Sequence, residues 1–194
     1  MRHRNWDLFH ETPIEQYRVI STREIHPKPR RILVDHVETP TGMQFEYVYR
    51  PLGAAAVFIL PITESGEVAL IDQYRHPLRR VITEVPAGSV EPGEDVFECA
   101  KRELLEEVGG EAKEWHALPA FFPQPAFTGA VFYPFVALGV TLGEPQLEES
   151  ELLTLNLTPV QEVYRMLDAG EILDGNTVIA LFQARPLLQE KGLL

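Results

Sequence analysis

The sequence from Gly88 to Gly110 reads GSVEPGEDVFECAKRELLEEVGG. The Pro-Gly pair at 92–93 indicates a turn, and Asp95 is a typical N-terminal cap for a helix that we expect to run to about Val108. The two glycines that follow predict the end of this helix, because glycine readily adopts the left-handed conformation of a C-terminal cap. At 100° per residue, the apolar residues gather on one side that should face the core: Val96, Phe97, Ala100, Leu104 and Val108.

Three glutamates project together from the flank of this predicted helix. Glu103 and Glu107 are one turn apart, and Glu106 is three residues after Glu103. Like charges at this spacing repel, so the three glutamates destabilise the helix unless a cation binds between them. Oxygen ligands without His or Cys suit Mg²⁺ or Mn²⁺ rather than zinc. The alternative is a solvated acidic helix face, since charged residues are mostly exposed.

Eight positions fit the pattern G-x5-E-x7-R-E-U-x-E-E-x-G, where U is a bulky aliphatic residue: Gly88, Glu94, Arg102, Glu103, Leu104, Glu106, Glu107 and Gly109. This pattern resembles the signature of the Nudix hydrolases. The resemblance implies an α/β fold, a Nudix-type α/β/α sandwich with a mixed central sheet. Arg102 is then an internal counter-charge that orients the catalytic carboxylates. Its alternative role is an ordinary surface ion pair, worth less than about 1 kcal/mol.

The composition restricts the compartment and the partners. The 194 residues can bury one substantial core, and a single cysteine, Cys99, excludes an internal disulfide framework. A net charge of −12, from 17 basic and 29 acidic residues, argues against nucleic acid and anionic membranes as partners. A phosphate substrate would need metal ions between it and the carboxylates. No apolar run reaches transmembrane length and the N-terminus lacks a signal-peptide core, so we expect a cytoplasmic protein.

Residues 1–50 are predicted to form an N-terminal β segment, and residues 51–194 the Nudix domain. The β-like runs lie at 18–22, 31–38 and 44–49, and the last two are interpreted as a hairpin. A three-stranded sheet of this kind is too thin to be stable alone, so it should pack on the main domain or on a second subunit. The family resemblance implies that it mediates homodimerisation.

The rest of the chain reads as strands flanked by helices, which favours helix–sheet–helix layers. We expect strands at about 54–61, 68–74, 81–86, 115–122, 131–140 and 152–157. Thr158, Pro159 and Gln161 predict a capping box that opens a helix to about residue 169. A last helix should begin near residue 176 and end near 184, or continue past Pro186.

Two motifs outside the 88–110 stretch narrow the substrate. The sequences QYRHP at 73–77 and EVPAG at 84–88 are similar to those of ADP-ribose pyrophosphatases and related nucleotide-sugar hydrolases. Arg75 could form the bidentate hydrogen bonds to a diphosphate that only a planar guanidinium allows, or it could simply face solvent at the end of a strand. Glu84 is interpreted as a contact to metal or to the substrate ribose, or as a structural residue.

Pro125 lies sixteen residues after Gly109, a spacing that marks the ADP-ribose group of this family. Three departures from the pattern of that group leave the sugar of the substrate open. Ala126 replaces a common glycine, and Ala130 stands where an acidic residue is frequent. In the 88–110 stretch, Gly110 replaces the aliphatic residue that usually ends the Nudix signature.

An acidic loop precedes the strand at 152–157, with Glu148, Glu149 and Glu151. The resemblance implies that a loop glutamate here helps to activate the attacking water. Alignment on the following strand favours Glu149 and then Glu151 as this base. The alternative is an acidic loop that is simply solvated.

The main hypothesis is hydrolysis of ADP-ribose, or of a related nucleoside diphosphate sugar, to AMP and a sugar phosphate. Glu103, Glu106, Glu107 and the Ala87 carbonyl would hold Mg²⁺, which lowers the pKa of a bound water. Two alternatives remain open. One is a Nudix hydrolase that acts on CoA or dinucleoside polyphosphates, and the other is a non-catalytic Nudix module that senses ADP-ribose.

Overall fold

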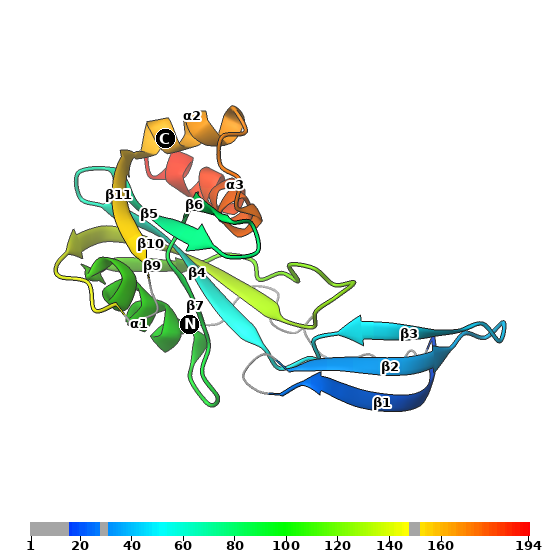
Figure 1. Cartoon of the computed structure of the whole chain (residues 1–194). Coiled ribbons are helices and arrows are strands. Elements are labelled where there is room, and N and C mark those ends of the chain that lie inside the picture. The colour runs from blue at the N-terminus through cyan, green and yellow to red at the C-terminus, as the bar shows by residue number, and fades with distance from the viewer. Residues whose placement is uncertain (1–15, 28–30, 148–151) are drawn as a thin grey trace.

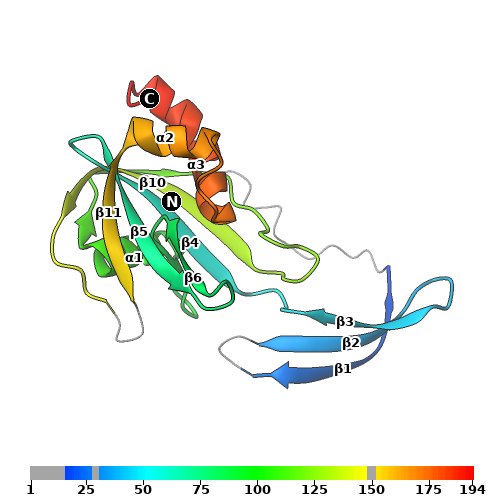
Figure 2. The same cartoon turned by 45° about the horizontal axis from the view of Figure 1, so that its top comes forward.

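The computed structural model describes residues 16–27, 31–147 and 152–194. Its first part is a three-stranded antiparallel sheet of β1 (Arg18–His26), β2 (Ile32–Glu38) and β3 (Gln44–Tyr49), in the order β1-β2-β3. The sheet extends away from the rest of the molecule (Figures 1 and 2). All three predicted strands are present, and the predicted β2–β3 hairpin is confirmed.

The second part is built on a mixed sheet in the order β11-β5-β4-β10-β8. Its long strands are β4 (Ala55–Thr63), β5 (Glu67–Arg75), β10 (Val131–Leu142) and β11 (Leu153–Pro159). Four short strands complete it: β6 (Arg80–Glu84), β7 (Ala87–Ser89), β8 (Gly110–Glu111) and β9 (Glu114–Ala117). Strands β4 and β10 pair in parallel, whereas the other pairs are antiparallel, so the predicted mixed sheet is confirmed.

Helices cover both faces of this sheet. Helix α1 (Val96–Val108) packs on one face, and α2 (Val160–Asp168) and α3 (Gly175–Glu190) pack on the other (Figure 1). Strand β4 shows why, because its alternate side chains enter two separate cores. Val57 and Ile59 join the core beneath α1, whereas Phe58 and Leu60 join the core beneath α2 and α3. The result is the predicted α/β/α sandwich.

Two local predictions are wrong in detail. The strand expected at 115–122 ends at Ala117, although Phe121 still forms a bridge with Phe132. The predicted capping box at residues 158–161 does not form, because Thr158 belongs to the end of β11 and its hydroxyl donates to Asn156. Helix α2 therefore begins directly after Pro159 without a side-chain cap.

The last helix continues through Pro186 to Glu190, as one of the two sequence interpretations expected. Its N-terminal cap is Asp174, whose carboxylate accepts a hydrogen bond of 2.7 Å from the Thr177 N–H. Among the described residues, no helix combines the length and apolarity that crossing a membrane requires.

Candidate functional site

Helix α1 begins and ends where the sequence predicts. The Asp95 side chain accepts hydrogen bonds from the N–H groups of Phe97, at 2.9 Å, and Glu98, at 3.3 Å. Gly109 adopts the left-handed conformation, with φ of 64°, and a Cβ there would lie 2.4 Å from the Gly143 carbonyl oxygen. Glycine is therefore required at position 109 for its conformation and for the close approach of residue 143.

The apolar stripe of α1 brings two of the predicted ligands inward with it. Glu103 is 7% exposed and Glu107 is 2% exposed, and both side chains lie against β7. Glu107 accepts a 2.8 Å hydrogen bond from the Ala87 N–H. A Cβ on Gly88 would lie 1.8 Å from the Glu103 carboxyl carbon, so only glycine lets this carboxylate approach the β7 backbone.

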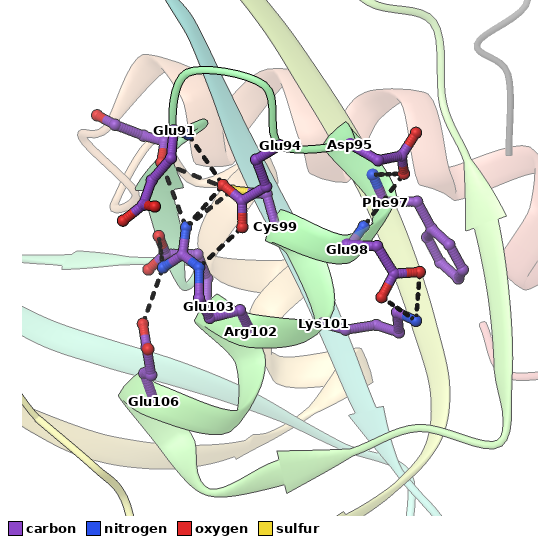
Figure 3. Close-up of polar contacts among 11 residues, drawn as sticks. Glu91, Glu94, Asp95, Phe97, Glu98, Cys99, Lys101, Arg102, Glu103 and Glu106 are labelled. Atoms are coloured by element: carbon purple, nitrogen blue, oxygen red, sulfur yellow. Dashed lines mark hydrogen bonds and ion pairs between the residues drawn. The ribbon is translucent and has the colours of Figure 1, made fainter.

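Arg102 holds three carboxylates from one guanidinium group (Figure 3). Its Nε and Nη2 donate to Glu94 at 2.9 and 3.1 Å, and Nη1 donates to Glu103 at 2.7 Å and to Glu106 at 2.9 Å. The hydrogen bonds from Arg102 lower the pKa of Glu94 to about 2, and those contacts with the carboxylates raise the pKa of Arg102. The predicted internal counter-charge is thus present, and it connects the turn before α1 with the glutamates of the helix.

The donor set fits a hard divalent cation by its chemistry. Its three side chains, Glu103, Glu106 and Glu107, are carboxylates, and Glu103 and Glu107 are buried beside the backbone of β7, where Ala87 supplies the fourth predicted ligand. In the described residues, however, no group of three His, Cys, Asp or Glu side chains is arranged to hold a metal ion. The Arg102 guanidinium instead bridges Glu103 and Glu106. Arg102 therefore supplies the positive charge in this arrangement.

Arg75 and Glu84, both predicted to touch the substrate, contact each other. Arg75 forms a bidentate ion pair with Glu84, in which Nε donates at 2.7 Å and Nη2 donates to the second carboxylate oxygen. Glu84 is 3% exposed, so this fork fixes the guanidinium at the end of β5. The hydrogen bond to Glu84 is the main cause that raises the pKa of Arg75, and the charges of Asp174 and Glu107 contribute to the rise. Arg75 thus lies close enough to Glu107 for their charges to interact.

Pro125 lies in a different place. It lines a cavity of about 470 Å³ between the N-terminal sheet and the segment 125–129, together with Tyr17, Tyr47 and Arg50. The Tyr47 hydroxyl donates to the Ala126 carbonyl at 2.9 Å across this boundary. None of the residues that line the cavity belongs to α1 or β7. The structure thus does not join Pro125 to the carboxylate cluster.

The two predicted bases, Glu149 and Glu151, lie outside the described residues. The chain that leads toward them is attached to the end of α1 by main-chain hydrogen bonds. The Gly143 N–H donates to the Gly109 carbonyl, and the Gln146 N–H donates to the Glu106 carbonyl, each at 2.8 Å.

Sequence reasoning missed one buried polar contact behind the cluster. Thr177 in α3 is 0% exposed, and its hydroxyl accepts a 3.0 Å hydrogen bond from the Val85 N–H. The signal available in the sequence was Asp174 three residues before Thr177, a typical helix cap that would have located the start of α3. Nothing local in the sequence indicates its partner, which is 92 residues away.

Comparisons with known proteins agree with this architecture. The NUDIX domain family matches residues 52–180. The chain is 34% identical to a methanol dehydrogenase activator of Bacillus methanolicus over 178 residues, which cover 90% of this chain and 92% of that protein. It is 32% identical to an ADP-ribose pyrophosphatase of Bacillus subtilis over 154 residues, which cover 77% and 82% of the two chains.

A solved structure of an ADP compounds hydrolase superposes with a TM-score of 0.81 at 23% identity, and the match covers 95% of this chain and 100% of that one. At this identity the likeness concerns the fold. It includes the N-terminal sheet as well as the sandwich, because so little of either chain is left out.

Proposed function

Because the chain belongs to the Nudix hydrolase family, in its ADP-ribose pyrophosphatase-like subfamily, we propose that it hydrolyses the diphosphate bond of ADP-ribose or a related nucleoside diphosphate sugar. The products are AMP, or the corresponding nucleoside monophosphate, and a sugar phosphate. The observation that carries the proposal is the burial of Glu103 and Glu107 against β7, where glycine at position 88 makes room for a carboxylate.

Nudix hydrolases use divalent metal ions, and we propose Mg²⁺ for this chain, with Mn²⁺ as its substitute. Glu103, Glu106, Glu107 and the Ala87 carbonyl are the proposed ligands. When bound, the cation neutralises the diphosphate and lowers the pKa of a water molecule. Two buried carboxylates favour this role, because buried charges in proteins are paired or coordinate metals.

The other residues of the site contact the substrate, activate the water or position these groups. The Nη1 of Arg75 takes no part in the bidentate ion pair with Glu84. This group donates to the diphosphate and stabilises charge in the transition state. Glu84 holds the guanidinium in that orientation. Glu149, or else Glu151, accepts the proton of the attacking water. Arg102 orients the carboxylates of α1. Pro125 lies apart from them, in the cavity at the N-terminal sheet, and contributes to the choice of substrate from there.

A substrate panel tests this proposal. The purified protein is incubated with Mg²⁺ and ADP-ribose, GDP-mannose, CoA, a dinucleoside polyphosphate or NADH, and the products are separated by ion-exchange chromatography. We expect AMP and ribose 5-phosphate from ADP-ribose at the highest kcat/KM. Preferential cleavage of CoA or of the dinucleoside polyphosphate would replace the proposed substrate, and tight binding of ADP-ribose without any cleavage would indicate a sensor module.

A second candidate function is the stimulation of a partner dehydrogenase. The observation in its favour is the similarity to the methanol dehydrogenase activator, which extends over nine tenths of both chains. The test measures the rate of a methanol dehydrogenase with and without this protein in the presence of Mg²⁺. An unchanged rate eliminates this candidate and leaves the hydrolase proposal as it stands.

We also propose that the chain acts as a cytoplasmic homodimer, with residues 1–50 as the dimerisation segment and 51–194 as the catalytic domain. All nine residues of β1 are exposed, including Val19, Ile20 and Ile25, which leaves an apolar surface on a thin sheet. Multi-angle light scattering should give twice the chain mass of 22.0 kDa. Ile20→Glu should lower that value toward one chain mass, whereas a monomeric wild type would contradict the proposal.

A further inference from the structure

A chain of polar contacts runs from α3 to the segment 84–88 beside the carboxylate cluster. The Asp174 carboxylate accepts hydrogen bonds from both the N–H and the hydroxyl of Thr177, at 2.7 and 2.8 Å. The same hydroxyl accepts a hydrogen bond from the Val85 N–H at 3.0 Å. Thr177 is 0% exposed and Val85 is 1% exposed, so water does not replace these contacts.

The segment 84–88 carries three of the features that shape the proposed active site. Glu84 fixes the guanidinium of Arg75, the Ala87 N–H donates to Glu107, and Gly88 gives room to Glu103. On its other side the segment is held by β4, where the Ile59 N–H donates to the Pro86 carbonyl and Phe58 pairs with Ala87. Thr177 thus fixes the segment from the face of the sheet opposite to α1.

We infer that Thr177 is a positioning residue for the metal and diphosphate site, acting through the Val85 N–H on the segment 84–88. The inference rests on the proposed function, since it assigns the segment to that site. A hydroxyl is suited to this position because it donates to Asp174 and accepts from Val85 at the same time. The N-terminal cap of α3 does not require the hydrogen bond between Val85 and Thr177, because the Thr177 N–H already donates to Asp174.

Three variants separate positioning from simple packing. Thr177→Val keeps the shape of the side chain but leaves the buried Val85 N–H without its acceptor. Thr177→Ser keeps the hydroxyl. Leu181→Val, in the same helix and in the same core as Val85, removes one methylene but no side-chain hydrogen bond, and serves as the matched packing control. Thermal unfolding of each variant shows whether it folds.

Two measurements on metal-free protein need no activity. Amide hydrogen exchange at Val85, and at Ala87 and Gly88 beyond Pro86, should become about tenfold faster in Thr177→Val and stay close to wild type in Thr177→Ser and Leu181→Val. Mn²⁺ binding, followed by electron paramagnetic resonance, should weaken about tenfold in Thr177→Val alone, which is the lower end of the effect of losing an outer partner of a metal site. The Mg²⁺ concentration for half-maximal hydrolysis should rise by a similar factor.

The inference is overturned if Thr177→Val lowers the Tm but leaves exchange at 84–88 and Mn²⁺ affinity at the wild-type values. It is also overturned if Leu181→Val, at an equal loss of Tm, weakens Mn²⁺ binding to the same extent. If the wild-type protein cleaves no diphosphate, the proposed function fails. The exchange and Mn²⁺ measurements still decide the role of Thr177 in that case.

Discussion

The N-terminal sheet and the α1–β7 region use the same two residue types, arginine and glutamate, in opposite surroundings. On the sheet the arginine–glutamate pairs stand on the surface: Arg18–Glu38, Arg23–Glu46 and Arg31–Glu24. In α1 one arginine serves three glutamates, and two glutamates of the helix are nearly inaccessible.

The difference lies in what each region needs from outside the chain. An exposed pair is solvated with or without its partner, so it contributes little and needs nothing more. A buried carboxylate loses its hydration and must recover that energy from hydrogen bonds and cations. The buried carboxylates of the α1–β7 region therefore suit the proposed cation, whereas the exposed apolar residues of the three-stranded sheet suit the proposed dimer contact.

The largest expected effect is on catalysis, from Glu107→Gln. We expect kcat to fall about 10³-fold, because one charge of the proposed metal site is lost while the amide oxygen can still accept from the Ala87 N–H. The measurement is the steady-state rate of ADP-ribose hydrolysis at saturating Mg²⁺. Glu98→Gln, on the exposed side of the same helix, is the control and should keep wild-type turnover. Equal rates for Glu107→Gln and wild type would remove Glu107 from the mechanism.

Next in size is the cost of a methyl group at two glycines that are needed for different reasons. At Gly88 an added Cβ overlaps the Glu103 carboxylate, which is the far end of a flexible side chain, so Gly88→Ala should displace this carboxylate from β7 and weaken Mn²⁺ binding about tenfold. At Gly42, in the β2–β3 turn, there is open space and only the φ of 85° requires glycine. Gly42→Ala should therefore cost about 1 kcal/mol, and Gly42→Asn less.

Urea unfolding of these three variants, with Mn²⁺ titration, checks the comparison. A Gly88→Ala protein as stable as wild type and with unchanged Mn²⁺ affinity would mean that the close approach of Glu103 to β7 has no functional weight.

A third prediction concerns the folding stability at acidic pH. The pKa of Glu94 falls from 4.5 to about 2 on folding, chiefly through Arg102. Between these values the unfolded chain binds the proton and the folded chain does not, so stability present above pH 4.5 is lost as the pH falls toward 2. Glu94 can account for up to about 1.4 kcal/mol per pH unit in this window. Glu94→Gln should remove that part of the slope.

The comparison residue for this experiment is Glu38 of the N-terminal sheet, whose pKa is also lowered by its hydrogen bond to Arg18. Because the Arg18 side chain that pairs with Glu38 is 68% exposed, against 30% for Arg102, Glu38→Gln should change the pH dependence of the urea midpoint much less than Glu94→Gln does. Equal slopes for the two variants would contradict the contrast between the two regions.

The smallest effect is expected for the Arg23–Glu46 pair, in which both side chains are more than half exposed. Arg23→Gln should lower the Tm by less than about 2 °C and leave hydrolysis unchanged. Differential scanning calorimetry gives the shift. A loss of several degrees would show that the pair is covered in the assembled protein, and would then support the proposed dimer contact at this sheet.

The parts of the fold that were predictable from the sequence depend on neighbours along the chain. The caps at Asp95 and Gly109, the inward face of α1 and the two strands of the β2–β3 hairpin each follow from fewer than 25 consecutive residues. The capping box at Thr158 failed because pairing of β11 with β5 outweighed a local cap signal.

The site was predictable as a set of residues but not as a set of contacts. The sequence indicates Arg75 and Glu84 separately, yet their ion pair depends on how β5 and β6 twist against each other. The Thr177–Val85 contact spans 92 residues, and Pro125 lies at the N-terminal sheet because of long-range packing. Such contacts follow from tertiary structure, which no local pattern encodes.

The attachment of residues 143 and 146 to the C-terminal turn of α1 uses main-chain atoms alone. Main-chain hydrogen bonds of this kind tolerate almost any change of side chain but not a change in the number of residues between them. The side chains at these positions can therefore change, whereas a deletion of one residue between 143 and 146 would break one of the two main-chain hydrogen bonds. In related sequences the number of residues between the positions of Gly143 and Gln146 should consequently vary less than the identities of those residues.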